Sequence, residues 1–184
     1  MIPWATPSVL VALIWLWLLD PNHGVINAFL LHVGIIHQPI AWLATSHTAL
    51  PTLIIIDAWQ GIPFFSVIIL AALQGVPEEL KDAAKTDGCN RFGVFIHVVL
   101  PYIRPTIFIT LVLRIIWTAN YIDLIYILTG GGPGYVTTTI PLQSYRSAYK
   151  IGDFGQGTAL AMIQALVLAA LITVYVRLTS GQDS

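Results

Sequence analysis

Four side chains that can bind or stack against a ligand recur on one face of an apolar stretch in the middle of the chain. They are Thr110, Arg114, Trp117 and Tyr121, with Asn120 at the edge of the stripe. At 100° per residue the four fall within about 60° on a helical wheel. Charged side chains are costly in lipid and usually face a bundle interior or a cavity. The stripe therefore predicts either a pathway for a polar solute, whose hydroxyl groups Arg114 and Asn120 would bind, or ties to neighbouring helices.

A second stripe of this kind precedes the first along the chain. Asp57, Gln60, Gly61 and Phe64 share one face of another apolar stretch, which suits either helix packing or the lining of a pore. Trp4 stands near the start of the chain's first apolar stretch, and we expect its ring at a membrane–water interface.

The remaining reactive residues do not form a recognisable catalytic or metal-binding pattern. Four of the five histidines lie between His23 and His47, without close His or Cys partners. No Ser-His-Asp or paired-carboxylate constellation can be argued from the scattered residues. Cys89, the only cysteine, allows neither a disulfide within this sequence nor a multi-thiolate site. We therefore predict no catalytic residue, no metal ligand and no cofactor bound by this chain, which is not expected to be an enzyme.

Composition predicts a chain whose outside faces lipid. Hydrophobic residues make up 57% of the sequence and charged residues 9%, whereas a soluble domain is typically about 25% charged. The formal net charge of -1 leaves no broad basic face for nucleic acid. Backbone groups in lipid must be satisfied within the segment, so helices are the expected form. The predicted fold class is all-α, a polytopic transmembrane helix bundle.

Four apolar stretches can each reach the roughly 20 residues that a helix needs to cross a bilayer. They cover about residues 3–19, 50–73, 106–128 and 158–178, and we predict one span in each. The first differs from a secretory signal, because no Lys or Arg precedes it and no small-x-small cleavage site follows Leu19.

Basic residues are unevenly placed between these stretches. Segment 75–104 carries four Lys or Arg, and Arg177 lies at the far end of the fourth stretch. Segment 20–48 carries none and segment 130–157 carries two. Because Lys and Arg accumulate in cytoplasmic loops, we predict that segment 75–104 and the C-terminus are cytoplasmic.

Segment 75–104 predicts two short helices with a break between them. Pro77 suits a first helical position, and Gly88 stands where a left-handed residue would end that helix. Asn90 can cap a second helix through Val98, and Pro101 then marks the start of the third span. From the residues alone, this hairpin either lies solvated on the bilayer surface or offers its small, partly apolar face to a partner.

The order of residues in this segment resembles the EAA loop of ABC importer permeases. The matching residues are Asp82-Ala83-Ala84, Gly88 after three residues, and Val98-Val99-Leu100-Pro101 after nine more. The family has Glu-Ala-Ala and Ile-x-Leu-Pro, so Asp82 replaces Glu and Val98 replaces Ile. The resemblance implies an ATPase-coupling loop formed by Glu79, Asp82, Ala83, Ala84, Gly88, Leu100 and Pro101.

Other segments are similar to the sugar-importer branch of that family, the maltose-transporter-like permeases. Residues 122–133 resemble the end of the span that follows the EAA loop, and residues 24–27 and Trp42-Leu43 also look similar. Such permeases usually have six spans with a type I importer core. This chain begins at what looks like the third, so about four of the six are expected and the chain is expected to be N-terminally short.

The resemblance implies a permease subunit of an ATP-driven, binding-protein-dependent importer of a sugar or oligosaccharide in the bacterial inner membrane. Its expected partners are a second permease subunit, an ABC ATPase dimer, an extracytoplasmic binding protein, the sugar and membrane lipid. ATP and Mg would bind the ATPase, because this sequence has no Walker-type phosphate loop. Arg114, Trp117, Asn120 and Tyr121 are the candidate substrate pathway. The alternative is a truncated membrane remnant that does not transport.

Overall fold

The computed structural model describes residues 2–180, and every regular element in that range is helical. In chain order the elements are α1 (Ile2–Ala5), α2 (Ser8–Leu18), α3 (Val25–His32), α4 (Ser46–Gln74), α5 (Glu78–Thr86), α6 (Arg91–Val94), the π-helical η1 (Phe95–Val99), α7 (Leu100–Ala119), α8 (Asp123–Leu128), α9 (Ile140–Tyr145), the π-helical η2 (Arg146–Ile151) and α10 (Phe154–Ser180). The predicted all-α class is confirmed.

Three of the described helical segments are long and apolar enough to cross a membrane. They are Ser46–Gln74, Arg91–Leu128 and Phe154–Arg177, and Ser8–Leu18 is a shorter apolar helix. In place of the continuous helix predicted over 3–19, the structure has α1 and α2 with a break at Thr6 and Pro7. Proline disfavours helical backbone in the residue before it, which explains the break. The remaining 11 residues of α2 span only about 16 Å at 1.5 Å per residue.

The boundaries of the three long segments differ from those predicted. Helix α4 begins at Ser46 and continues through Pro51 and Pro63, and α10 begins at Phe154. The predicted span 106–128 is the second part of a longer helical run that starts at Arg91 and is interrupted between α7 and α8. The apolar residues predicted where each membrane segment lies. The helices extend beyond them into polar residues, which hydropathy does not assign to a span, so the predicted boundaries were too short.

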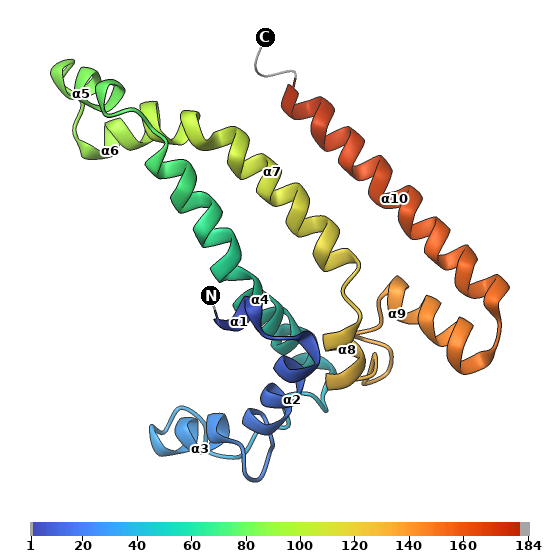
Figure 1. Cartoon of the computed structure of the whole chain (residues 1–184). Helices are drawn as coiled ribbons and strands as arrows, with labels where there is room; N and C mark the ends of the chain where they lie inside the picture. The colour runs from blue at the N-terminus through green and yellow to red at the C-terminus, as the bar shows by residue number, and fades with distance from the viewer. Residues whose placement is uncertain (1, 181–184) are drawn as a thin grey trace.

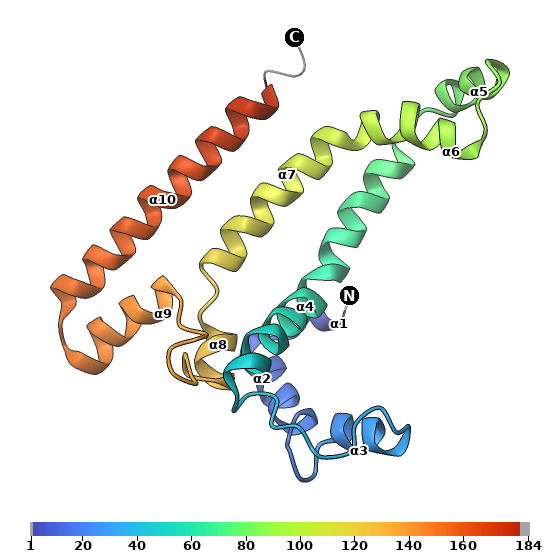
Figure 2. The same cartoon turned by 180° about the vertical axis from the view of Figure 1, so that it is seen from behind.

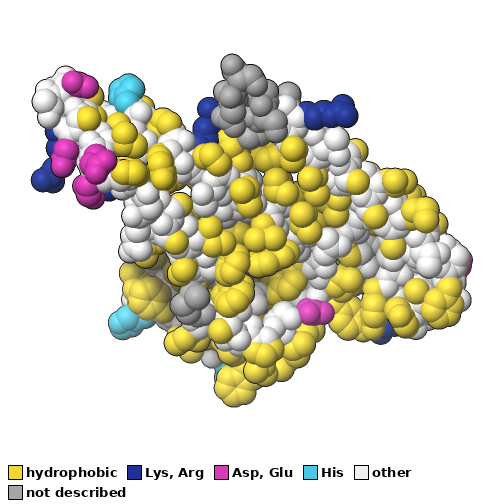
Figure 3. All heavy atoms as spheres, turned by 45° about the horizontal axis from the view of Figure 1, so that its top comes forward, with side chains coloured by type: hydrophobic (Ala, Val, Ile, Leu, Met, Phe, Trp, Pro, Cys, Tyr) yellow, Lys and Arg dark blue, Asp and Glu magenta, His cyan; other side chains and the backbone are white. Residues whose placement is uncertain are grey.

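The long helices α4, α7 and α10 lie along similar directions between two groups of short helices (Figures 1 and 2). Helices α5 and α6 project at one end, where α10 also finishes, and α2, α3, α8 and α9 gather at the other. Helix α4 packs against α7, α2 against α8, and α10 against α9 and η2. Charged side chains gather on the α5–α6 projection, whereas hydrophobic ones cover the long helices (Figure 3).

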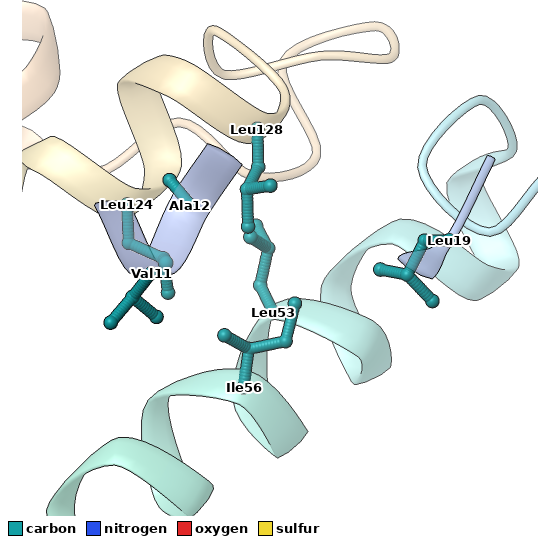
Figure 4. Close-up of a cluster of buried hydrophobic side chains, with 7 residues drawn as sticks. All are labelled: Val11, Ala12, Leu19, Leu53, Ile56, Leu124 and Leu128. Atoms are coloured by element: carbon teal, nitrogen blue, oxygen red, sulfur yellow. The ribbon is translucent and has the colours of Figure 1, made fainter. Parts of the chain in front are cut away.

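The buried apolar core sits at the end opposite to α5. Its residues come from α2, α4 and α8 and from the residue after α2: Val11, Ala12, Leu19, Leu53, Ile56, Leu124 and Leu128. Figure 4 shows the side chains of α2, α4 and α8 together, with Leu19 to one side of them. None of the membrane-length window of α10 is buried within the chain. Such an apolar, exposed helix suits contact with lipid or with other membrane helices.

One buried amide organises the loop between α2 and α4. Asn27 is 2% exposed, and its Nδ2 donates to the carbonyl oxygens of Pro21 (3.2 Å) and Ile40 (2.9 Å). Its Oδ1 accepts from the Ile40 N–H and from the Trp42 indole at 2.9 Å. These bonds hold α3 against the irregular segment before α4, so the two segments singled out by the sequence resemblance form one unit.

Candidate functional site

An ion pair joins α4 to α7 within the candidate membrane spans. The Nη2 of Arg114 donates to the Asp57 carboxylate at 2.5 Å and to the Asp57 carbonyl at 3.0 Å. Thr118, one turn along α7, donates to the same carboxylate at 3.4 Å. The guanidinium lies so close to Gly61 that a Cβ at this position would collide with it. Glycine at position 61 is therefore what lets the Arg114 head group reach Asp57.

The two residues directly after α7, Asn120 and Tyr121, make further polar links to neighbouring helices. Tyr121 donates from its hydroxyl to the Oε1 of Gln60 on α4. Asn120 donates to the Ile116 carbonyl at 2.8 Å, and its Oδ1 accepts from Gln164 on α10 at 3.3 Å. The end of α7 is thus tied to α4 on one side and to α10 on the other.

Aromatic rings surround the ion pair. Trp117 lies 5.0 Å from Phe64 between ring centroids, and Phe64 stacks on Trp4 at 4.8 Å. The Arg114 guanidinium lies over the ring of Phe65 at 5.6 Å from its centroid. Tilted and stacked rings at these separations attract one another, and a cation over a ring face adds to that attraction.

The ion pair, Trp117 and Trp4 line an open cavity of about 500 Å³ between α1, α4 and α7. Its lining residues are Trp4, Asp57, Gln60, Gly61, Arg114, Ile116, Trp117, Thr118, Asn120 and Tyr121. The four residues predicted as a substrate pathway therefore share one cavity, and three of the four residues of the second stripe join them. Thr110 bonds to the Thr106 carbonyl within its own helix and is not among this cavity's lining residues.

Three lining residues, Ile116, Thr118 and Trp4, were not assigned to the site from the sequence, and Trp4 is the most distant of them along the chain. We expected it at a membrane interface, but it packs on Phe64 and lines the cavity. The reason is the break at Pro7, which lets α1 fold against α4 instead of continuing the line of α2. No periodicity could reveal this, because α1 is a single turn.

The predicted turn between the two helices of segment 75–104 is confirmed. Helix α5 ends at Thr86, and Gly88 has φ +87° in the left-handed region, which glycine adopts without steric cost. Asn90 caps α6 as predicted, because its Oδ1 accepts from the Gly93 N–H at 2.8 Å. Glu78–Lys81 and Asp82–Lys85 pair along α5 at 2.8 and 2.7 Å. The hydrogen bond from Lys85 to Asp82 raises the pKa of the Lys85 ammonium above its ordinary value.

Pro101 is the second residue of α7 and marks the start of that helix as predicted, but the helix is not separated from the one before it. Helix α6 passes through η1 into α7 without a break, and Pro101 and Pro105 lie inside this run. Widened π-helical turns can satisfy the backbone groups that a proline leaves without a partner, and η1 ends two residues before Pro101. Helix α6 is therefore mechanically continuous with the helix that carries Arg114.

The predicted coupling residues lie in two places on the projecting end. Glu79, Asp82, Ala83 and Ala84 are on α5, which buries no residue, and Gly88 follows it. Leu100 and Pro101 lie beyond α6, at the start of α7. Two large apolar side chains are also exposed on the projection, Leu80 on α5 (46%) and Phe92 on α6 (69%). The projection combines charged and apolar groups that no described part of the chain covers.

Among the described residues, no group of three or more His, Cys, Asp or Glu side chains is placed to hold a metal ion.

Comparison with known proteins identifies a family. The model of the binding-protein-dependent transport system inner membrane component matches residues 1–180. The trehalose/maltose transport system permease protein MalF of Thermococcus litoralis is 35% identical over 177 residues, covering 96% of this chain and 59% of MalF. The sulfoquinovosyl glycerol transport system permease protein SmoG of Agrobacterium fabrum is 32% identical over 183 residues, covering 100% of this chain and 59% of SmoG.

A solved structure has the same fold. A bacterial ABC transporter that imports the acidic polysaccharide alginate matches with a TM-score of 0.84 and 24% identity, over 97% of this chain and 62% of that chain. This chain thus spans about three-fifths of the length of the relatives it matches. It is a multi-pass membrane protein and belongs to the family of binding-protein-dependent transport system inner membrane components.

Proposed function

We propose that this chain is the permease part of an ATP-driven importer, and that a sugar or oligosaccharide passes through the cavity between α4 and α7. The observation that carries the proposal is the convergence of Arg114, Trp117, Asn120 and Tyr121 on one cavity. Binding sites for small molecules combine apolar and aromatic walls with a few fixed polar groups. A sugar presents hydroxyl groups to such polar side chains and flat C–H faces to aromatic rings.

The proposed coupling element is segment 75–104. Its exposed helices α5 and α6 would seat on a cytoplasmic ABC ATPase dimer, which binds ATP and Mg. The orientation follows from the basic residues, five on the proposed cytoplasmic side against two on the other. An extracytoplasmic binding protein would deliver the sugar, and a second permease subunit would complete the pathway beside the lipid-facing helices.

The continuity of α6, η1 and α7 supports a mechanical link from ATPase to cavity. Arg114 lies 20 residues beyond Val94, or about 30 Å along a helix that rises 1.5 Å per residue. Closure of the ATPase dimer would shift α6, and the rigid run would carry the shift to the cavity wall. Switching of this type is a rigid-body change between two packed states.

Uptake of a radiolabelled disaccharide into proteoliposomes that contain the complete transporter tests the proposal. Trp117→Ala removes a cavity wall, and Trp17→Ala is the matched control, because Trp17 is 86% exposed on α2 and is not a lining residue. Tyr121→Phe removes only the hydroxyl that donates to Gln60. We expect Trp117→Ala to lower uptake at least tenfold and Tyr121→Phe severalfold, with membrane levels and ATPase co-purification near those of the parent. Parental uptake by both cavity variants would refute the proposed pathway.

A further inference from the structure

We infer that the cavity selects uncharged saccharides over acidic ones, and that Asp57 is the residue that sets this selectivity. The inference rests on the proposed function and names the substrate class of the same cavity. It follows from how the charges of the lining residues are arranged.

The charges of the cavity cancel within one contact. Among the described lining residues, Arg114 is the only cationic side chain and Asp57 the only anionic one. They meet at 2.5 Å, and the same Nη2 also donates to the Asp57 carbonyl. Phe65 lies against a face of the guanidinium, and Gly61 leaves no space between the guanidinium and α4. The positive charge is therefore held against α4 and compensated there.

An acidic saccharide would meet an unfavourable charge balance in this cavity. Its carboxylate would have to displace Asp57 from Arg114 or lie beside the paired Asp57 carboxylate. Both outcomes leave an anion without a cation beside partly buried groups, and charge interactions are stronger there than in bulk water. A neutral saccharide brings hydroxyl groups, which can bond to Gln60, Thr118 and Tyr121 without breaking the ion pair.

Removing the charge of Asp57 without changing its shape should reverse the preference. Asp57→Asn keeps a hydrogen-bond acceptor beside Arg114 but leaves the guanidinium charge uncompensated, so the cavity becomes cationic. An uncompensated arginine binds carboxylates through two parallel hydrogen bonds. Both types of cargo occur among the similar transporters, one for trehalose/maltose and one for the acidic polysaccharide alginate. In this cavity the charge at position 57 would decide which of the two types of cargo is favoured.

The test is calorimetric titration of the complete transporter in lipid nanodiscs with two matched probes. The probes are maltose and the same disaccharide with its non-reducing CH2OH oxidised to a carboxylate. We expect the parent to bind maltose at least tenfold more tightly than the acid, and Asp57→Asn to bind the acid more tightly than maltose. The matched control, Asp57→Asn with Arg114→Gln, removes both charges and should again prefer maltose. Arg114→Gln alone leaves a lone carboxylate and should weaken binding of the acid beyond the parental ratio.

The outcomes separate this inference from the proposed function. Equal binding of the two probes by the parent, or a ratio that stays constant through the four proteins, would overturn the charge-selectivity inference while leaving the cavity a sugar site. Binding of neither probe by any of the four proteins would overturn the proposed function, and this inference with it.

Discussion

The turn at Gly88 offers the sharpest test of whether segment 75–104 works through its shape. Gly88 has φ +87°, and a Cβ added there would meet no atom within 4 Å. A substitution therefore acts within this chain through the backbone conformation alone. Left-handed backbone costs a residue with a Cβ about 1–2 kcal/mol, which corresponds to roughly a 5- to 30-fold loss in the population of the native turn. Asparagine tolerates this conformation better than other non-glycine residues.

Gly88→Asn and Gly88→Val separate conformation from bulk. Both add a side chain of similar size to open space, but valine is β-branched and opposes the left-handed turn. We expect both proteins to reach the membrane, because the spans are elsewhere. Gly88→Asn should retain most of its ATPase on affinity purification, whereas Gly88→Val should lose at least about four-fifths of it, the lower end of the 5- to 30-fold range. Hydrogen exchange across residues 84–94 should rise in the valine variant only.

Two results would refute this reasoning in different ways. Equal loss of ATPase by the two variants would show that added bulk at the interface matters and that the left-handed turn does not. Parental transport and ATPase retention by Gly88→Val would show that segment 75–104 is not the coupling element.

Three further predictions concern single residues or exposed positions. Asn27→Ala removes a buried amide that makes four hydrogen bonds, to Pro21, Ile40 and Trp42, so the purified protein should lose about 2–6 kcal/mol of unfolding free energy, at about 0.5–1.5 kcal/mol for each hydrogen bond; an unchanged thermal unfolding midpoint would contradict this. Asn90→Ala removes the cap of α6 and should cost about 1 kcal/mol, seen as faster hydrogen exchange at Gly93 with unchanged protection in α10. In a Cys89→Ser background, a cysteine at Lys85 should be shielded from an impermeant thiol reagent added outside cells and one at Val136 should react, and the opposite pattern would overturn the proposed orientation.

Local signals in the sequence predicted the parts of the structure that depend on a few neighbouring residues. Gly88 and Asn90 ended and began helices as expected, because the left-handed turn and the side-chain cap are each made within four residues. The residues from Arg114 to Tyr121 line one cavity as predicted. They lie on α7 or within two residues of its end, so the helical period of about 3.6 residues places them on one side. The two stripes did not reveal that Arg114 pairs with Asp57, since such a pairing depends on how α4 and α7 pack.

Predictions that depended on the path of the chain were less accurate. Trp4 could not be placed from sequence, because its contact with Phe64 joins residues 60 positions apart. Pro101 lies at the start of α7 as predicted, but the sequence did not reveal that the π-helical turns of η1 join α7 to α6 in one helical run. The first apolar stretch has the composition of a span, yet the break at Pro7 shortens its continuous helix to α2.

The most direct test of an ATP-coupled pathway is the side from which the cavity can be reached. A cysteine at Thr118, in a Cys89→Ser background, lines the cavity and can be labelled with an impermeant thiol reagent in proteoliposomes that contain the complete transporter with its binding protein. We expect labelling without ATP to occur from the cytoplasmic side and labelling of the trapped ATP-bound state to occur from the opposite side. Maltose should slow the labelling in both states. Labelling from one side only, unaffected by ATP and by sugar, would contradict the account.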